Sequence, residues 1–242
     1  MVFSEFKALF CAAMQKNGIS VQDETTIERF HSFVEHLMEV NAVTNLTAVR
    51  NIPDVICKHL VDSMFVAYLI PQNARVLDLG CGPGFPSLPL AIMRPDLKIV
   101  ALDSTAKKIA FVQETTARLG LSNVTAIAGR AEDREISAQI GTFDIVVSRA
   151  VAKMSILSEL CLPYVRVGGA LVAMKAAKAE EELAEARKGI AILGGGEPVL
   201  HKRELTMADG SVESRCLIEV PKIKKTPAIY PRAYAVISKK PL

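Results

Sequence analysis

Residues 75–87 read Arg75-Val76-Leu77-Asp78-Leu79-Gly80-Cys81-Gly82-Pro83-Gly84-Phe85-Pro86-Ser87. The apolar start predicts a buried strand, the glycines predict a tight turn, and a helix is expected over 87–93. A turn with so few side chains lets a ligand approach the backbone at the carboxyl edge of a parallel sheet, where open α/β folds bind ligands. This stretch therefore predicts an α/β fold with a nucleotide-like ligand.

The residue after the third glycine narrows the choice of ligand. A dinucleotide-binding turn needs Gly or Ala at its sixth position so that the helix packs near a pyrophosphate. Here that position is Phe85, which follows Gly80, Gly82 and Gly84. The turn therefore favours an adenosyl ligand without a phosphate, and it disfavours the alternative of a nicotinamide-dependent oxidoreductase.

The next two predicted strands, 98–102 and 124–128, end in further candidate ligand contacts. Asp103 stands roughly 20 residues beyond the turn, the spacing of an acid that accepts hydrogen bonds from ribose hydroxyls. Its alternative role is to cap the segment that begins at Ser104. Ala131 and Glu132 lie in the following loop, where Glu132 or the backbone could meet the edge of an adenine, although Glu132 alone could equally be a surface acid.

Beyond Pro71, short strands alternate with helices, which predicts βαβ crossovers and a parallel sheet. Besides the strands already named, we expect strands at 143–148 and 169–175 and helices near 106–119, 133–140, 156–164 and 178–192. Two final strands, 199–206 and 213–221, flank the turn Asp209-Gly210 and predict an antiparallel hairpin. The expected sheet therefore has seven strands, five parallel ones and a closing hairpin.

Three helices, predicted at 3–17, 24–40 and 53–69, precede the first strand. They predict a helical cap over residues 1–70, followed by a ligand-binding core at 71–221 and a basic tail at 222–242. Six of the 29 basic residues and none of the 26 acidic ones lie in that tail, which leaves the rest of the chain net acidic. Such a tail predicts either contact with a polyanion or a solubilising terminus.

Composition limits where the protein works. Half of the 242 residues are hydrophobic and 23% are charged, which excludes a disordered chain. We expect neither a signal peptide nor a membrane span, because no apolar run approaches the ~18 residues that a span needs. The five cysteines are scattered and form no CxxC pair, so the sequence predicts a cytoplasmic protein without disulfides or a metal site.

Taken in order, Val76–Pro86, Asp103, Arg130-Ala131-Glu132 and Phe143-Asp144 resemble a class I S-adenosylmethionine-dependent methyltransferase. Further motifs narrow the resemblance to the small-subunit ribosomal RNA guanine-N7 methyltransferase family, also called the glucose-inhibited division protein B family. These motifs are Asn45–Arg50, His59-x-x-Asp62-Ser63, Lys107-Lys108, Ser148-Arg149-Ala150 and the ending Lys239–Leu242. The resemblance runs from about residue 25 to the end, with departures at Cys81, Ser87 and Ala176.

The resemblance implies a Rossmann-like fold and methyl transfer from S-adenosylmethionine to guanine N7 in 16S ribosomal RNA, free or as a ribonucleoprotein. It implies cofactor contacts at Gly80, Phe85, Ala131, Glu132 and Arg149. Gly82 and Gly84 of the glycine turn and the acid Asp103 are further expected contacts. We expect a monomer. Alternatives are methylation of another RNA or position, and a ribosome-binding module without activity.

Guanine N7 carries a lone pair and no proton, so its methylation needs positioning and not a general base. In keeping with this, the loop after Ser148 contains neither an Asn-Pro-Pro-aromatic motif nor a Pro-Cys nucleophile. Arg149 is the expected catalytic residue, with a salt bridge to the cap as its alternative role. His59 and Asp62 could pair on one helical face, and Asn45 serves either as a polar contact or in a turn.

Overall fold

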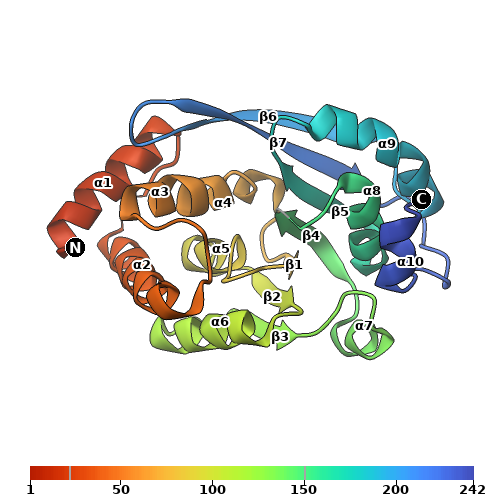
Figure 1. Cartoon of the computed structure of the whole chain (residues 1–242), viewed down its shortest axis with the longest axis horizontal. Coiled ribbons are helices and arrows are strands. Elements are labelled where there is room, and N and C mark those ends of the chain that lie inside the picture. The colour runs from red at the N-terminus through yellow and green to blue at the C-terminus, as the bar shows by residue number, and fades with distance from the viewer. Residues whose placement is uncertain (22, 150) are drawn as a thin grey trace.

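The computed structural model describes residues 1–21, 23–149 and 151–242. Within these residues a seven-stranded sheet has the order β3-β2-β1-β4-β5-β7-β6 (Figure 1). The parallel strands are β1 (Arg75–Leu79), β2 (Lys98–Asp103), β3 (Val124–Ala128), β4 (Phe143–Arg149) and β5 (Val165–Lys175), and β6 (Val199–Thr206) and β7 (Val212–Pro221) form the antiparallel hairpin. The predicted fold class, strand number and hairpin are confirmed.

Helices cover both faces of the sheet. On one face lie α1 (Phe3–Lys16), α2 (Glu24–Thr44), α3 (Ile52–Val55), α4 (Asp62–Met64), α5 (Ser87–Met93) and α6 (Ala106–Arg118). On the other lie α7 (Arg134–Ile140), α8 (Met154–Cys161), α9 (Ala179–Ile192) and α10 (Tyr234–Lys239). Successive strand residues alternate between these layers, as Val76 and Leu77 of β1 do, because side chains along a strand point to opposite faces. No helix in the described ranges is long and apolar enough to cross a membrane.

The helix predicted over 53–69 is wrong as a single element. Asn51 caps its start as expected, with Oδ1 accepting from the Asp54 N–H at 2.9 Å. The chain then passes from α3 into a π-helical turn, η1 (Ile56–Val61), then α4, and ends in the 3₁₀ turn η2 (Ala67–Leu69). A π turn holds an extra residue, which a helical apolar periodicity does not reveal.

The N-terminal helices pack into the same hydrophobic cluster as one face of the sheet. Phe33 of α2, for example, lies 6.5 Å from Phe111 of α6 and 5.4 Å from Phe85, measured between ring centroids. The division into a cap, a core and a tail stays a prediction.

Residues 222–242 are folded onto the rest of the chain, which corrects the expectation of six available cations. Lys222 is buried, and its Nζ donates to the carbonyl oxygens of Leu162 at 2.6 Å and Leu193 at 2.9 Å. Burial lowers the pKa of Lys222 to about 8. The same Nζ also donates to the Thr226 hydroxyl, so the Lys222 amine has three hydrogen-bond partners inside the protein. Lys222 is therefore a structural anchor that is inaccessible to a polyanion.

Arg232 is the second tail cation that the fold uses. Its Nε and Nη2 donate to the carboxylate of Glu159 on α8 at 2.8 and 2.6 Å, and its backbone N–H donates to the same carboxylate at 2.9 Å. The Glu159 side chain has no exposed surface. This ion pair therefore fixes the final helix, α10, against α8.

Replacement of Arg232 by Ala should lower the free energy of unfolding by about 3 kcal/mol, because it leaves the Glu159 charge buried and unpaired. Denaturant unfolding of the full chain measures the change. Arg187→Ala is the matched control, since its partner Glu197 is exposed, and it should change stability little. Equal effects of the two substitutions would contradict the anchoring role.

Candidate active site

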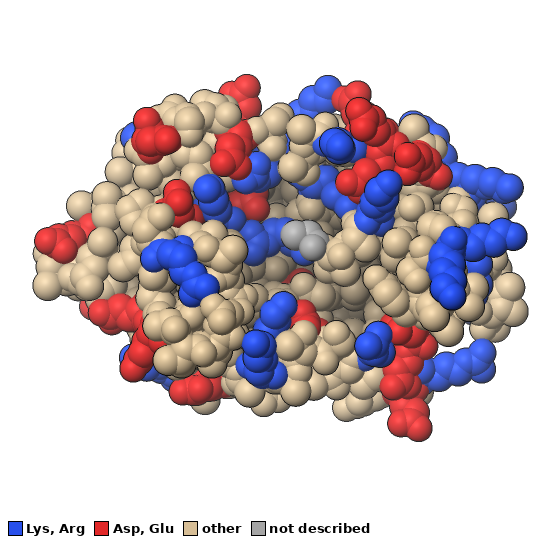
Figure 2. All heavy atoms as spheres, in the orientation of Figure 1, with Lys and Arg blue, Asp and Glu red and all other residues tan. Residues whose placement is uncertain are grey.

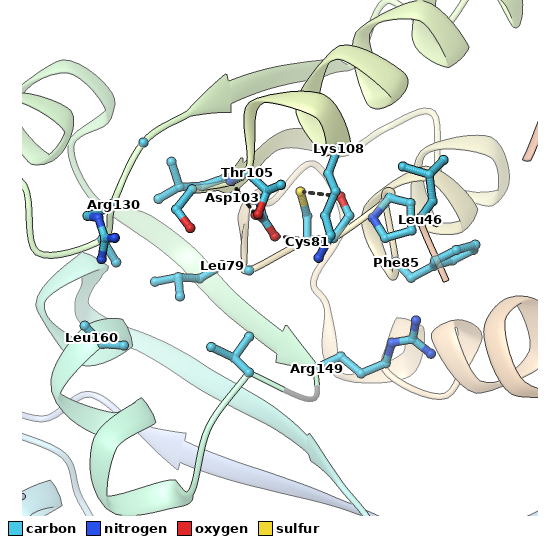
Figure 3. Close-up of a pocket in the computed structure, with 18 of the residues that line it drawn as sticks. Leu46, Leu79, Cys81, Phe85, Asp103, Thr105, Lys108, Arg130, Arg149 and Leu160 are labelled. Carbon is cyan, nitrogen blue, oxygen red and sulfur yellow. Dashed lines mark hydrogen bonds between the residues drawn. The ribbon is translucent and has the colours of Figure 1, made fainter. Parts of the chain in front are cut away.

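A cavity of about 560 Å³ opens at the carboxyl ends of β1, β2 and β4, beside the point where the strand order reverses. Open α/β folds bind ligands at such a point. The structure brings seven of the eight predicted site residues to its wall: Gly80, Gly82, Phe85, Asp103, Ala131, Glu132 and Arg149. Figure 3 shows Phe85, Asp103 and Arg149 around this cavity. Lys and Arg side chains surround a hollow on this side of the molecule (Figure 2).

The glycine turn is shaped for close approach of a ligand. Gly80 has φ +76°, and a Cβ atom there would lie 2.2 Å from Val151 Cγ2. Gly82 has φ +57°, and a Cβ atom there would meet no protein atom within 4 Å, so a side chain would enter the cavity. Gly84 is the predicted residue that does not line the wall: its Cβ position faces Leu88, so it serves the packing of the turn onto α5.

Asp103 ends β2 with both carboxylate oxygens held by backbone. Oδ2 accepts from the Gly82 N–H at 3.0 Å and Oδ1 from the Thr105 N–H at 2.8 Å. These bonds orient the carboxylate at the cavity wall, and each oxygen keeps a second lone pair for a ligand hydroxyl. The alternative helix-capping role is wrong, because Thr105 is the N-cap of α6 and no side chain among the described residues caps that helix; Asp103 instead orders the loop before it.

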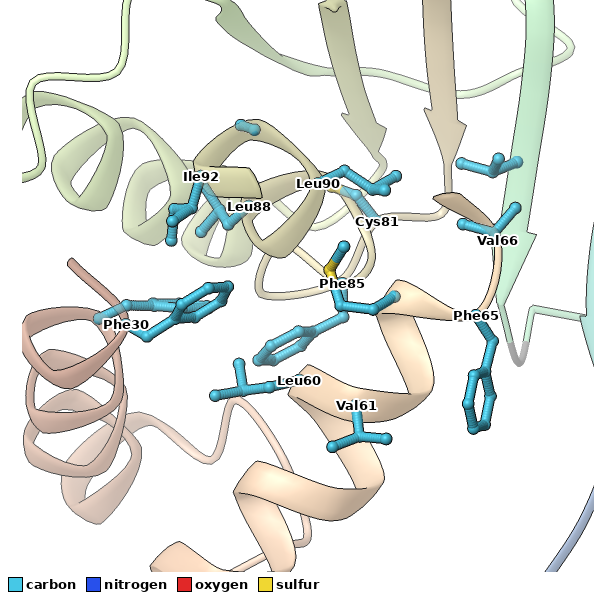
Figure 4. Close-up of a cluster of buried hydrophobic side chains, with 14 of the residues drawn as sticks. Phe30, Leu60, Val61, Phe65, Val66, Cys81, Phe85, Leu88, Leu90 and Ile92 are labelled. Carbon is cyan, nitrogen blue, oxygen red and sulfur yellow. The ribbon is translucent and has the colours of Figure 1, made fainter. Parts of the chain in front are cut away.

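Phe85 is 2% exposed and lies between the glycine turn and the N-terminal helices (Figure 4). The His59 ring stacks on it with centroids 4.5 Å apart, and Leu60 belongs to the same cluster. The place that a dinucleotide-binding protein leaves open near the pyrophosphate is therefore filled by an aromatic ring packed into the core.

The loop that follows β3 is held in place by a hydrogen bond and an ion pair. The Tyr164 hydroxyl donates to the Ala131 carbonyl oxygen at 2.7 Å, and the Arg130 guanidinium lies 3.5 Å from the Glu132 carboxylate. Gly129 and Arg130 also line the cavity. The loop thus presents backbone and one paired acid to a ligand.

Arg149 does not project into the middle of the cavity. Its guanidinium donates to the Lys58 carbonyl oxygen at 2.9 Å and lies 3.3 Å from Asp62 Oδ2 and 5.2 Å from the Phe85 ring centroid. Asp62 also accepts from Arg215 Nε of β7 at 2.9 Å. The prediction that His59 and Asp62 pair with each other is wrong. Both side chains instead contact Arg149, because the π-helical turn directs them there.

His59 is held neutral. Burial and the nearby Arg149 charge lower its pKa to about 3, although the Lys58 carbonyl opposes the shift. Its Nε2 lies 2.8 Å from Thr47 Oγ1 and its Nδ1 lies 3.4 Å from both Arg149 terminal nitrogens. Nδ1 also lies 3.2 Å from the Lys58 carbonyl oxygen, so the neutral ring links Thr47 on one side to Arg149 and Lys58 on the other.

A second cavity, of about 550 Å³, adjoins the first and shares His59, Arg149 and Val151 with it. Its wall also contains Lys58, Lys175 and Arg215, and its acids are Asp62 and Glu182. Lys175 Nζ contacts Glu182 Oε2 at 2.7 Å. The second cavity therefore has four basic groups in its wall, whereas the first combines the glycine turn and Asp103 with three basic groups, Lys108, Arg130 and Arg149.

The structure resolves the remaining candidates. Asn45 has the turn role: it ends α2 with φ +52° and accepts from Arg50 Nη2 at 2.6 Å, and it is absent from both cavity walls. Lys108 lines the first cavity, whereas Lys107 donates to the Thr44 carbonyl oxygen at 3.0 Å. Ala150 lies outside the described residues. Across the described residues, no three His, Cys, Asp or Glu side chains form a metal-binding group.

Several wall residues were missed because they come from distant segments. Thr47, Leu160 and Tyr234 line the first cavity, and Lys175 and Arg215 line the second. Lys175 ends β5 and is the one with a usable signal, because parallel strands place their carboxyl ends at the same edge.

The fold is that of the Rossmann-like α/β domains, with the glycine-turn cavity beside the point where the strand order reverses. An O-methyltransferase from Bacillus cereus, solved in complex with S-adenosylhomocysteine, superposes with a TM-score of 0.55 at 16% identity over 90% of this chain and 100% of that one. At this identity the likeness concerns the fold alone.

The chain belongs to the family of rRNA small subunit methyltransferase G (GidB), whose profile matches residues 26–205. It is 42% identical to Ribosomal RNA small subunit methyltransferase G of Brevibacillus brevis, over 98% of this chain and 99% of that protein. It is 40% identical to the protein of the same name in Lactobacillus helveticus, over 96% and 98%. The family predicted from the motifs is confirmed, which removes the oxidoreductase alternative.

Asp78, below the glycine turn, should make the stability of the protein depend on pH. It is fully buried, and Oδ2 accepts from the Ser87 N–H at 2.9 Å while Oδ1 has no partner among the described residues. Burial raises the pKa of Asp78 from 3.8 to about 7, although the Ser87 hydrogen bonds oppose the shift. The folded state therefore binds a proton that the unfolded state loses between about pH 4 and 7.

Wild-type stability should consequently fall relative to that of Asp78→Asn as the pH rises from about 4 to 7, by up to about 1.4 kcal/mol per pH unit, and then level off. Urea unfolding at stepped pH measures the difference. Asp209→Asn is the control: hydrogen bonds from Ser211 lower the pKa of Asp209, so the stability difference should stay level between about pH 4 and 7 and change only at lower pH. A flat difference for Asp78→Asn would show that its carboxyl ionises normally.

Proposed function

We propose that this chain transfers the methyl group of S-adenosylmethionine to N7 of a guanine in small-subunit (16S) ribosomal RNA. We also propose that it acts as a monomer in the cytoplasm, in keeping with five free cysteines. The observation that carries the proposal is the pair of adjoining cavities, one with a glycine turn and an acid and the other lined by basic side chains, which meet at His59, Arg149 and Val151.

The first cavity fits S-adenosylmethionine. The open space at Gly82 admits a ligand against the backbone, and Asp103 offers acceptors to two ribose hydroxyls. Ala131 and Glu132 would face the base, and Gly80, Phe85 and Arg149 would complete the contacts. When bound, the cofactor supplies an electrophilic methyl group on a sulfonium centre.

The second cavity fits a nucleotide of an RNA. Four basic side chains, Lys58, Arg149, Lys175 and Arg215, lie in its wall and offer N–H donors to a phosphate backbone, and each of them is held by a carboxylate. A base that enters from this side meets the first cavity at the shared wall. Nucleotides that react at the base leave their stack to reach such a pocket.

The state of the acids supports N7 as the reacting atom. Each carboxylate in the described walls has a partner: Asp62 with Arg149, Asp103 with backbone N–H groups, Glu132 with Arg130 and Glu182 with Lys175. His59 is neutral but occupied by Thr47 and Arg149. Attack by N7 releases no proton, so it requires no free base.

Arg149 is proposed to place the guanine by hydrogen bonding. Attack leaves positive charge on the guanine ring, which a bare cation beside it would oppose. Asp62, 3.3 Å from Arg149, partly compensates the guanidinium charge, so the planar fork donates hydrogen bonds at a lower electrostatic cost.

The cofactor assignment predicts that Asp103→Ala weakens binding of S-adenosylhomocysteine by about 10- to 1000-fold, through loss of one or two charge-assisted hydrogen bonds. Asp103→Asn keeps one acceptor for the Gly82 N–H, so its affinity for S-adenosylhomocysteine should lie between those of wild type and Asp103→Ala. Calorimetry measures both, with thermal melting as the control for folding. Unchanged affinity in the folded Ala variant would remove Asp103 from the cofactor site.

The substrate assignment is tested by incubating 16S ribosomal RNA and, separately, the small subunit with the protein and S-adenosylmethionine. Borohydride and aniline should then cut the RNA at one guanosine, because this treatment cleaves at N7-methylated guanosine. Arg149→Ala should slow methylation by about 10- to 100-fold, and Arg149→Lys should restore part of the rate. Methyl incorporation without scission would overturn N7 as the acceptor.

A further inference from the structure

Tyr234 brings the end of the chain to the wall of the first cavity. It is the first residue of α10 and lines that cavity together with Leu160 of α8 and the loop 129–132. Figure 1 shows α10 beside α8, on the side of the sheet away from the N-terminal helices. The tyrosine thus stands at the far end of the cavity from His59 and Phe85.

The position of Tyr234 does not depend on its own side chain. Arg232 binds the buried carboxylate of Glu159, and Ile237, one turn after Tyr234, has no exposed surface. Tyr234 itself is 41% exposed, and within the described residues no side chain hydrogen-bonds its hydroxyl. The anchors on either side therefore hold a ring that contributes little to the core.

The other aromatic rings of the described wall are already engaged. Phe85 is 2% exposed and covered by His59, and His59 stacks on Phe85 and contacts Thr47. Tyr234 is consequently the aromatic side chain of this wall with an accessible face. A flat base binds well against such a face, and ring stacking on bases is tolerant of sequence and geometry.

We infer that Tyr234 forms the aromatic wall for the adenine of the cofactor, so that the C-terminal segment completes the cofactor site. The inference rests on the proposed function, and it assigns to residues 230–240 a role in cofactor affinity. The neighbouring positions fit an adenine: Leu160 and Ala131 supply apolar surface, and Glu132 and the backbone of 129–132 supply polar groups.

The test is calorimetry with S-adenosylhomocysteine on the full chain. Tyr234→Ala should weaken binding by about 5- to 50-fold, as expected for loss of one stacking partner, and Tyr234→Phe should bind within about twofold of wild type. Tyr68→Ala is the matched control, because Tyr68 is similarly exposed, at 51%, but lies outside this cavity. Ligand-free melting temperatures of the Tyr234 variants should match that of wild type.

A second readout uses the absence of tryptophan from the sequence, which leaves four tyrosines to dominate the emission. S-adenosylhomocysteine should quench wild-type emission, and the quenching should shrink in Tyr234→Phe. If wild type binds no S-adenosylhomocysteine, the proposed function fails. If wild type binds and Tyr234→Ala binds equally well, only the inference fails, and it fails equally if Tyr234→Ala weakens binding of 16S RNA alone.

Discussion

The packing of Phe85 is the contact on which the rest of the site depends. The ring ends the glycine turn, yet it is buried against Phe33 of α2 and stacked under His59 of η1. One side chain thus fixes the backbone that faces the cofactor cavity and ties it to the N-terminal helices. Because protein interiors are close-packed, the turn cannot shift without moving those helices.

Charge in the site is organised around Asp62 in a similar way. This carboxylate pairs with Arg149 of β4 and with Arg215 of β7, so it connects both strands to α4. Arg215 also pairs with Glu213 at 2.8 Å, so each guanidinium has a carboxylate partner and both are held in fixed positions at this wall. Lys175, paired with Glu182, keeps its charge nearby in the same cavity.

How much of this the sequence predicts depends on how local each feature is. The strand, glycine turn and Asp103 were predictable, because strand alternation and turn chemistry act over a few residues. The π-helical turn at 56–61 was missed, and with it the orientation of His59 and Asp62 toward Arg149. Lys222 and Arg232 were assigned to a free basic tail, because charge counting cannot reveal that Leu162, Leu193 and Glu159 bind them.

Contacts between segments far apart in the sequence also explain why both ends of the chain matter to a site that is built on β1 and β2. A sheet edge offers backbone and acids, but it leaves the two open sides of a bound nucleoside uncovered. Thr47 and His59 close one side from the N-terminal helices, and Tyr234 stands at the other on α10. The buried anchors at Phe85 and at Arg232–Glu159 hold these outer residues in position, so that binding need not order them first, and preorganisation of this kind lowers the entropic cost of binding.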